Sequence, residues 1–282
     1  MKRLACAVLG LLIAVACGSS PSSTFVDPNA TTDGGIDDGG SSGSFPTADS
    51  SQPPAPKPAT DVQAVVTSDN AFSFGYGDGT SIATFIRGEG SDGDAIFNCP
   101  VGFGPTAYLV PAAQAPTGAY LYIIAWADEQ VTQGTLAQFK RVGADAVYSG
   151  DAKWQVCAVG TPFDSHGTGP DQGTVGAGIA SCNMAAAGAT YSKGWVSTSG
   201  AITPGALGKL AIGEANDDAG GLFPIVCQKD DAGTQGIDAV AKWMWFDPQD
   251  NGSPFSGNAG NRTKTYLIFR LPADALPPSP VK

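Results

Sequence analysis

The chain has 282 residues and a formal net charge of −11 at pH 7. An acidic surface argues against nucleic acid and against adhesion to anionic lipid headgroups, because both are negatively charged. The sequence also contains no phosphate-binding glycine motif and no nucleotide fingerprint, so nucleotides are not expected as partners.

Residues 1–16 have the pattern of an export signal. A positively charged amino end precedes the apolar stretch 4–15, which is too short to remain as a transmembrane helix. The small residues before Cys17, in "IAVAC", are typical of a bacterial lipoprotein signal that is cleaved before the cysteine. We therefore expect Cys17 to be acylated, for example with palmitate, and to anchor the protein to a membrane. The alternative is an ordinary signal peptide cut near Ala16, which leaves Cys17 as a free thiol.

Residues 17–60 lack the apolar residues that a core requires. They are mainly Gly, Ser, Asp, Thr and Pro, and such a segment cannot offset its ordering entropy by burying apolar surface. We expect a disordered linker, stiffened by "PPAPKP", before a folded domain at 61–276 and a Pro-rich tail at 277–282. This organisation indicates an exported protein displayed at the bacterial cell envelope. Gly18 resembles the enterobacterial signal for the outer membrane, which favours the outer membrane or cell surface.

Four cysteines fall in the expected folded domain, an even number in an oxidising compartment. No pair has the close CxxC spacing of a zinc site, so two disulfides are favoured over a metal site. Four cysteines allow three pairings. Of these we favour Cys182–Cys227 with Cys99–Cys157.

Short segments with alternating aromatic and β-branched residues recur along the domain, separated by clusters of Gly, Pro, Asp or Asn. Helical periodicity over ten or more residues is hard to find. The 38 Gly and 21 Pro residues also favour turns over helices. We therefore predict an all-β fold, an antiparallel β-sandwich. The predicted strands are 71–76, 119–128, 135–140, 153–159, 209–214, 241–246 and 265–271.

Two stretches between these strands have the composition of long loops, 160–178 and 246–264. We expect the first to be tied down by Cys182, which follows it. Long loops on a rigid sandwich are where ligand-binding residues usually lie.

Several strand sequences resemble those of galactose-binding-like β-sandwich domains, the jelly-roll modules attached to many bacterial glycosidases and exported proteins. "VTSDNAFSFGYGDG" is similar to the family's "ADN-aromatic-x-aromatic" strand, and "YLYIIAWADEQVTQGTLAQF" to its long central strand. "DAKWQV" and "AKWMW…YLIFRLP" are similar to its closing Trp strand and its Trp-x-Trp and Phe-Arg pair. In many members this last pair comes before the Asp-Asn strand, which implies either a permuted order or shared strand chemistry alone. The resemblance implies a jelly-roll fold, which hosts sugar binding, protein binding and structural roles.

Polar turn formers precede the first predicted strand. Asp69 and Asn70 can bond their own backbone and turn the chain into it. Phe72, Phe74 and Tyr76 would then share one face, directed to the core. In a second interpretation, Asp69 or Asn70, with Asp78 at the far end of the strand, lines a ligand site at the loop edge.

Sugar recognition requires an aromatic face for the C–H surface of a pyranose and carboxylates or amides for its hydroxyls. Trp195 is the main candidate, because Gly and polar residues surround it in "YSKGWVSTSG", as expected of an exposed platform. The other tryptophans lie in strand patterns and are expected in the core. The polar candidates are Asp128, Glu129, Asn216, Asp217 and Asp218.

Calcium is the only metal for which the sequence offers ligands. In "DPQDNG", Asp247, Gln249 and Asn251 alternate before a glycine, as in the first half of an EF-hand loop, although the twelfth position is Asn258. The acidic stretch "GEGSDGD" at 88–94 is a second place for structural calcium. Solvated turns are the alternative for both, and no other cofactor is expected.

Enzyme signatures are weak. There is no Gly-x-Ser-x-Gly elbow, and His166 lies with Asp164 and Ser165 in an expected loop. Glu214 with Asp128 or Glu129 is the carboxylate pair that a glycosidase would require. We therefore predict a non-catalytic cell-envelope lipoprotein that binds carbohydrate, such as a cell-surface or environmental polysaccharide. The alternatives are a structural or protein-interaction lipoprotein without a small ligand and, third, a secreted hydrolase.

Overall fold

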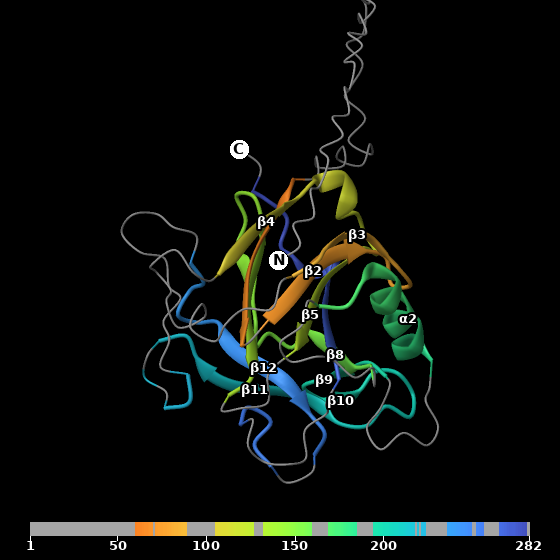
Figure 1. Ribbon diagram of the computed structural model, residues 1–282. Coiled ribbons are helices and arrows are strands. Elements are labelled where there is room, and N and C mark those ends of the chain that lie inside the picture. The colour runs from red at the N-terminus through yellow and green to blue at the C-terminus, as the bar shows by residue number, and fades with distance from the viewer. Residues whose placement is uncertain are drawn as a thin grey trace, which may run out of the picture. The chain divides into compact units, whose positions relative to one another are not determined.

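Two antiparallel sheets pack face to face in this protein, as its computed structural model shows (Figure 1). The predicted all-β class and the antiparallel β-sandwich are therefore confirmed, and the arrangement is consistent with a jelly-roll fold. The structure describes residues 60–69, 71–88, 105–126, 132–159, 169–184, 194–217, 219, 221–223, 236–249, 252–256 and 265–280.

All of these residues belong to one structural unit, Ala55–Lys282. The expected signal peptide, the lipidation site Cys17 and nearly all of the linker lie outside the described residues, so these expectations stay predictions. No helix in the described part of the chain is long and apolar enough to cross a membrane.

The first sheet has the strand order β11-β12-β6-β1-β4, with β7 paired to β6. Its centre is the eight-residue ladder between β1 and β6, which runs from Val62 opposite Arg141 to Asp69 opposite Gly134. The strands are β1 (Val62–Asp69), β4 (Thr106–Val110), β6 (Gly134–Arg141), β7 (Ala146–Tyr148), β11 (Lys209–Ala215) and β12 (Lys242–Asp247).

The second sheet has the strand order β10-β9-β8-β13-β5-β2-β3. Its strands are β2 (Ala71–Gly77), β3 (Ile82–Ile86), β5 (Tyr120–Trp126), β8 (Gln155–Ala158), β9 (Val196–Ser197), β10 (Gly200–Ala201) and β13 (Leu267–Pro272). Two short 3₁₀ helices, η1 (Ala112–Gln114) and η2 (Ala273–Ala275), complete the connections.

The chain passes from one sheet to the other immediately after Asp69, since β1 belongs to the first sheet and β2 to the second. As predicted, Phe74 and Tyr76 of β2 are buried, and Phe72 packs against the same core. Phe74 stacks on Tyr108 of β4 with ring centroids 4.4 Å apart, so this pair joins the two sheets. Burial of one such side chain contributes about 1.5–3 kcal/mol to folding.

Helix α2 (Gln172–Asn183) corrects the prediction of a loop over 160–178. Asp171 caps its amino end by accepting a hydrogen bond of 2.7 Å from the Thr174 backbone N–H. Val175, Ile179 and Cys182 are buried on one side of the helix, at helical spacing. The glycines of this segment lower its intrinsic helix propensity, and tertiary packing overrides them.

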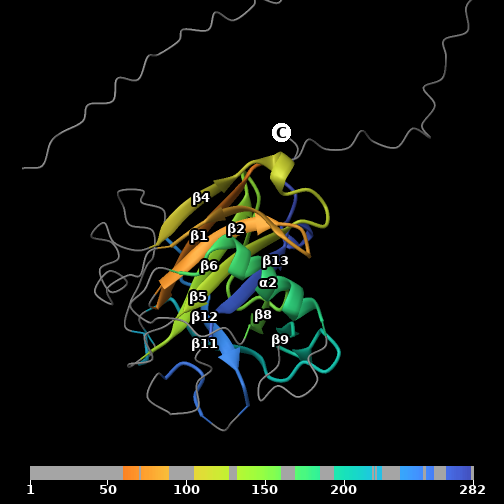
Figure 2. The same ribbon diagram turned by 45° about the vertical axis from the view of Figure 1, so that its right-hand side comes forward.

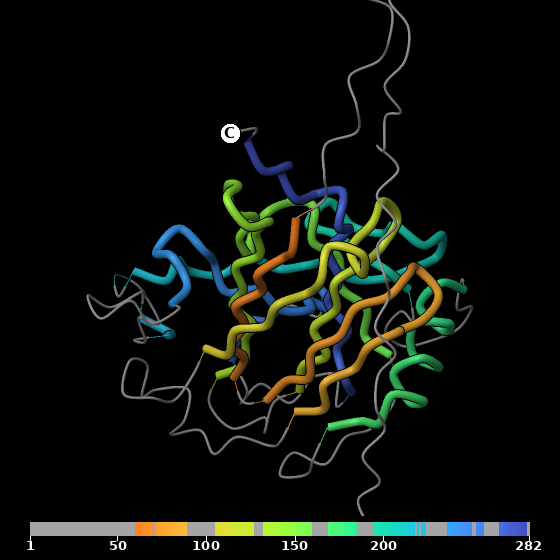
Figure 3. The backbone as a smooth tube through the Cα atoms, turned by 90° about the horizontal axis from the view of Figure 1, so that it is seen from above, coloured from red at the N-terminus to blue at the C-terminus, as the bar shows by residue number. Residues whose placement is uncertain are grey.

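The helix covers the outer face of the second sheet (Figures 2 and 3). Its buried residues share a cluster with Tyr122, Ile124 and Trp126 of β5, whereas the intervening residues of β5 face the core between the sheets. Gly178 makes a close approach possible, because a Cβ there would lie 3.0 Å from Ile268 Cδ1.

A disulfide joins Cys157 of β8 to Cys182 of α2. The favoured pairing of Cys182 with Cys227 and of Cys99 with Cys157 is therefore wrong, because helix α2 places Cys182 directly on β8. The expectation that Cys182 ties down this region is confirmed. Cys99 and Cys227 lie outside the described residues.

The two ends of the described chain lie side by side. The hydroxyl groups of Thr60 and Ser279 are hydrogen-bonded at 2.7 Å, and the Ser279 hydroxyl donates to the Val142 carbonyl at 2.6 Å. Thr60 lies two residues before β1 begins.

Candidate functional site

Trp195 is not an exposed platform, which corrects the main expectation for ligand binding. Its exposed fraction is 1%, and its indole N–H donates to Asn183 Oδ1 at 2.7 Å. The Arg270 guanidinium lies 3.7 Å from the centre of its ring. The other four tryptophans are also buried, as predicted: Trp126, Trp154, Trp243 and Trp245.

Arg270 is the centre of the cluster that buries Trp195. Its guanidinium lies between that ring and the Tyr120 ring, 4.5 Å from the centre of the latter, and its Nε donates to Gln155 Oε1 at 2.7 Å. Cation–π contacts of this kind are stronger in a desolvated place. Burial lowers the pKa of Arg270, and burial raises the pKa of neighbouring Tyr122 to about 12. The cluster thus uses its polar groups internally and functions as packing.

The remaining sequence candidates have partners within the protein or lie outside the described residues. Asp69 is buried and accepts from the Thr132 hydroxyl at 2.5 Å. Asn216 is buried and donates to the Ile237 carbonyl at 2.8 Å, and exposed Asp217 accepts from the Ala219 N–H at 3.0 Å. These three are therefore turn and core residues. The candidates outside the described residues are Asn70, Asp128, Glu129 and Asp218.

A groove follows β11, the end strand of the first sheet in the described strand order, where it lies against the β9–β10 hairpin of the second sheet. It consists of two adjacent hollows of about 280 Å³ and about 540 Å³, and Thr198 and Lys209 line both of them. Pockets of this size suit a small ligand or a few units of a polymer. The lining residues are Thr198, Ser199, Gly200, Ala201, Ala206, Leu207, Gly208, Lys209, Leu210, Ala211, Ile212, Gly213, Asp247, Gln249, Ser253, Pro254 and Phe255.

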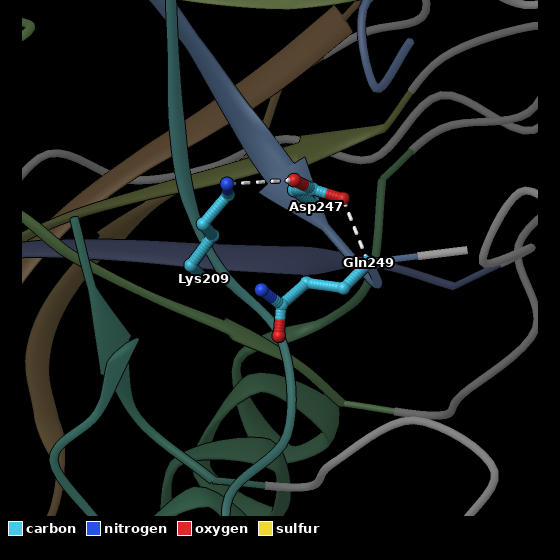
Figure 4. A network of polar contacts seen from close by, with 3 residues as sticks. All are labelled: Lys209, Asp247 and Gln249. Atoms are coloured by element: carbon cyan, nitrogen blue, oxygen red, sulfur yellow. Dashed lines mark hydrogen bonds and ion pairs between the residues drawn. The ribbon is translucent and has the colours of Figure 1, made fainter. Parts of the chain in front are cut away.

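Lys209, Asp247 and Gln249 all line this groove, and Figure 4 shows the ion pair and the backbone hydrogen bond that link them. Lys209, the first residue of β11, lies opposite Asp247, the last residue of β12, and their Nζ and Oδ2 atoms are 3.5 Å apart. Asp247 Oδ1 accepts the backbone N–H of Gln249 at 2.7 Å. The Lys209 side chain is 43% exposed, so this ion pair contributes at most about 1 kcal/mol to stability.

Gln249 has a φ of 63°, the one positive φ of a non-glycine residue in the described part of the chain. A left-handed conformation costs such a residue about 1–2 kcal/mol. The hydrogen bond from its N–H to Asp247 holds this turn in place. Figure 4 shows that the amide end of Gln249 points away from Asp247, and no partner of that amide is found among the described residues.

The predicted calcium loop begins at Asp247, whose two carboxylate oxygens both have partners within the protein. Asp247 Oδ2 lies 3.5 Å from the Lys209 ammonium nitrogen, and Asp247 Oδ1 accepts the backbone N–H of Gln249. The calcium expectation stays a prediction. Asn251 lies outside the described residues. Within the part of the chain that the structure describes, no group of three or more His, Cys, Asp or Glu could hold a metal ion.

Glu214, named for a hydrolytic pair, binds backbone. Its carboxylate accepts the N–H groups of Leu222 at 3.2 Å and Phe223 at 2.5 Å, and so closes the turn after β11. Its expected partners Asp128 and Glu129, and His166 with its neighbours, lie outside the described residues.

The sequence analysis missed Lys209 and Thr198 as site residues. A signal for Lys209 was present, because it begins one predicted strand and Asp247 follows the end of another, and antiparallel pairing places such ends opposite each other. No signal indicated the β9–β10 hairpin. Comparison with known proteins adds nothing to the site, since no family model, curated protein or solved structure matches the chain.

Proposed function

We propose that this protein is a lipid-anchored cell-envelope protein whose galactose-binding-like β-sandwich binds carbohydrate, without catalysis, in the groove along β11. The anchor rests on the sequence pattern at Cys17, and the family assignment rests on strand sequences. The groove supplies the place for a ligand.

The observation that carries this proposal is the lining of the groove. Lys209 offers an ammonium donor, Asp247 a carboxylate acceptor, and Gln249 an amide that can both donate and accept hydrogen bonds. These are the groups that sugar hydroxyls require. Gly200, which has no side chain, and Ala201, which has only a methyl group, lie beside them in the lining. An open groove of this shape suits a chain that passes across the surface.

The second candidate is a structural or protein-interaction lipoprotein without a small ligand. The burial of all five tryptophans favours it, because stacking platforms for sugars are exposed aromatic residues. This interpretation assigns no ligand to the groove.

A binding screen on the full chain, with its disulfides intact, separates the two candidates. The probes are immobilised neutral and acidic polysaccharides, each tested with calcium and again with EDTA. Binding that is lost in an Ala201→Trp variant, which places a large side chain in the groove, supports carbohydrate recognition there. Absence of binding to every polysaccharide contradicts it and favours a protein partner, to be sought by pull-down.

A further inference from the structure

We propose that Lys209, Asp247 and Gln249 form a clamp for adjacent hydroxyl groups of a neutral sugar, so that the groove selects uncharged over carboxylated glycans. This inference rests on the proposed function and specifies its ligand. It follows from the geometry, the charge balance and the backbone of these three residues.

The ion pair in the clamp is incomplete. A charge-assisted N–H···O bond is usually about 2.7–2.9 Å long, whereas Lys209 Nζ and Asp247 Oδ2 are 3.5 Å apart. An ammonium has three donors and a carboxylate about four acceptor sites. Both groups therefore keep capacity for a ligand that donates to one and accepts from the other, as a pair of neighbouring hydroxyls does.

The backbone around the clamp is specialised for holding it. Gly208 has a φ of 87°, and a Cβ there would lie 2.7 Å from the Asp247 carbonyl oxygen. Only glycine allows this close approach, which brings Lys209 beside Asp247. Just after β12, Gln249 keeps its left-handed conformation through its N–H bond to Asp247 Oδ1. Strain retained beside a groove is a feature of binding sites.

Charge favours a neutral ligand. The Lys209 ammonium is matched by the Asp247 carboxylate, so the clamp has no net charge to attract an acidic sugar. The chain as a whole carries −11, which repels a polyanion. The Asp247 carboxylate also repels a carboxylate placed beside it, whereas hydroxyls can donate to its spare acceptor sites.

The test measures dissociation constants of the full chain for neutral polysaccharides (galactan, dextran, mannan and xylan) and carboxylated ones (polygalacturonate, alginate and hyaluronate). The variants are Asp247→Asn, Lys209→Met and Gln249→Gly. Asp238→Asn is the matched control, because Asp238 also accepts the N–H of the residue two positions on, Val240, at 3.1 Å, but does not line the groove. Thermal unfolding of each variant confirms that it is folded.

We expect the strongest neutral ligand to bind Asp247→Asn and Lys209→Met about tenfold or more weakly, as loss of a hydrogen bond to a charged group implies. Binding to Asp238→Asn should be unchanged, and added salt should have little effect on a neutral ligand. Neutral binding that survives all three groove variants, or carboxylated glycans that bind as tightly as neutral ones, overturns the clamp but leaves carbohydrate binding intact. Failure of every glycan to bind the unmodified chain overturns both proposals.

Discussion

Arg270 and Lys209 are cations in two regions that the β9–β10 hairpin connects, and their surroundings are opposite. Arg270 is 7% exposed and lies between the Trp195 and Tyr120 rings. Lys209 is 43% exposed at its side chain and pairs with a carboxylate at the wall of a groove. Trp195 directly precedes β9, and the turn after β9 forms the other wall of that groove.

The difference explains why Trp195, the residue type most typical of a sugar site, is packed in the interior of this protein. A buried guanidinium must use its donors on partners within the protein, and Arg270 uses them on Gln155 and on aromatic faces. Polar groups at the groove have water as an alternative partner and can exchange it for a ligand. Changes in the first region should therefore affect stability, and changes in the second should affect binding.

The largest expected effect is that of Trp195→Ala. Loss of this buried ring and of its contact with Arg270 should lower the free energy of unfolding by about 3–5 kcal/mol. Urea denaturation followed by circular dichroism measures it, with Trp195→Phe as a milder control. A loss below about 1 kcal/mol would mean that the ring is not packed as described.

Removal of the Cys157–Cys182 disulfide should have the next largest effect. The double variant Cys157→Ser/Cys182→Ser should lose about 2–4 kcal/mol of unfolding free energy, because the bridge closes a loop with a sequence separation of 25. The double change avoids an unpaired thiol. Peptide mapping without reductant should find these two cysteines in one linked fragment, and a fragment linking either to Cys99 or Cys227 would contradict the structure.

Alkaline pH should weaken the Arg270 region. Burial raises the pKa of Tyr122 in the folded protein to about 12, above the ordinary value of 10.0, so only the unfolded chain ionises between these values. The stability contribution of neutral Tyr122 is thus complete below pH 10 and is lost as pH rises from about 10 to 12. Unfolding at stepped pH measures it, and Tyr122→Phe should remove this part of the dependence.

Asp171→Ala should cost about 1 kcal/mol, since Asp171 caps helix α2 through the Thr174 N–H. Thermal unfolding measures the loss. Asp171→Asn is the matched control, because an amide oxygen can still accept this bond. Equal losses in the two variants would show that the cap is not the cause.

The smallest expected effect is in the groove. Gln249→Gly should raise the unfolding free energy by no more than about 1 kcal/mol, because relief of the positive φ is partly offset by the greater entropy of the unfolded chain. Gln249→Ala keeps the strain and should show no gain. A stability loss of several kcal/mol in either variant would make Gln249 a packing residue and break the contrast between the two regions.

The strands could be predicted where aromatic alternation is strong. All seven predicted segments contain strands: β2, β5, β6, β8, β11, β12 and β13. Their alternating pattern reflects the burial of one face of each strand. Helix α2 could not be predicted from the sequence. Its glycines allow close contact with the sheet, but they also interrupt the helical spacing of its apolar residues. The short β9 and β10 have too few residues for any period.

The site was harder to predict than the fold. Polar neighbours in the sequence suggested that Trp195 is exposed, but its burial is due to Arg270 and Asn183, which come from a distant strand and from helix α2. The Lys209–Asp247 pair likewise joins the ends of two strands separated by a long connection. Such contacts between distant segments cannot be inferred from the residues on either side of a position in the sequence.

The hydrogen bond between Thr60 and Ser279 has a mechanical consequence. A force transmitted along the chain before residue 60 enters β1 almost at once, and β1 lies between β4 and β6 with its ladder bonds perpendicular to the strand. Pulling along that strand loads many of these bonds in shear together instead of opening them one at a time. A pull at residue 60 along the strand is therefore resisted by the β1 ladders as a whole.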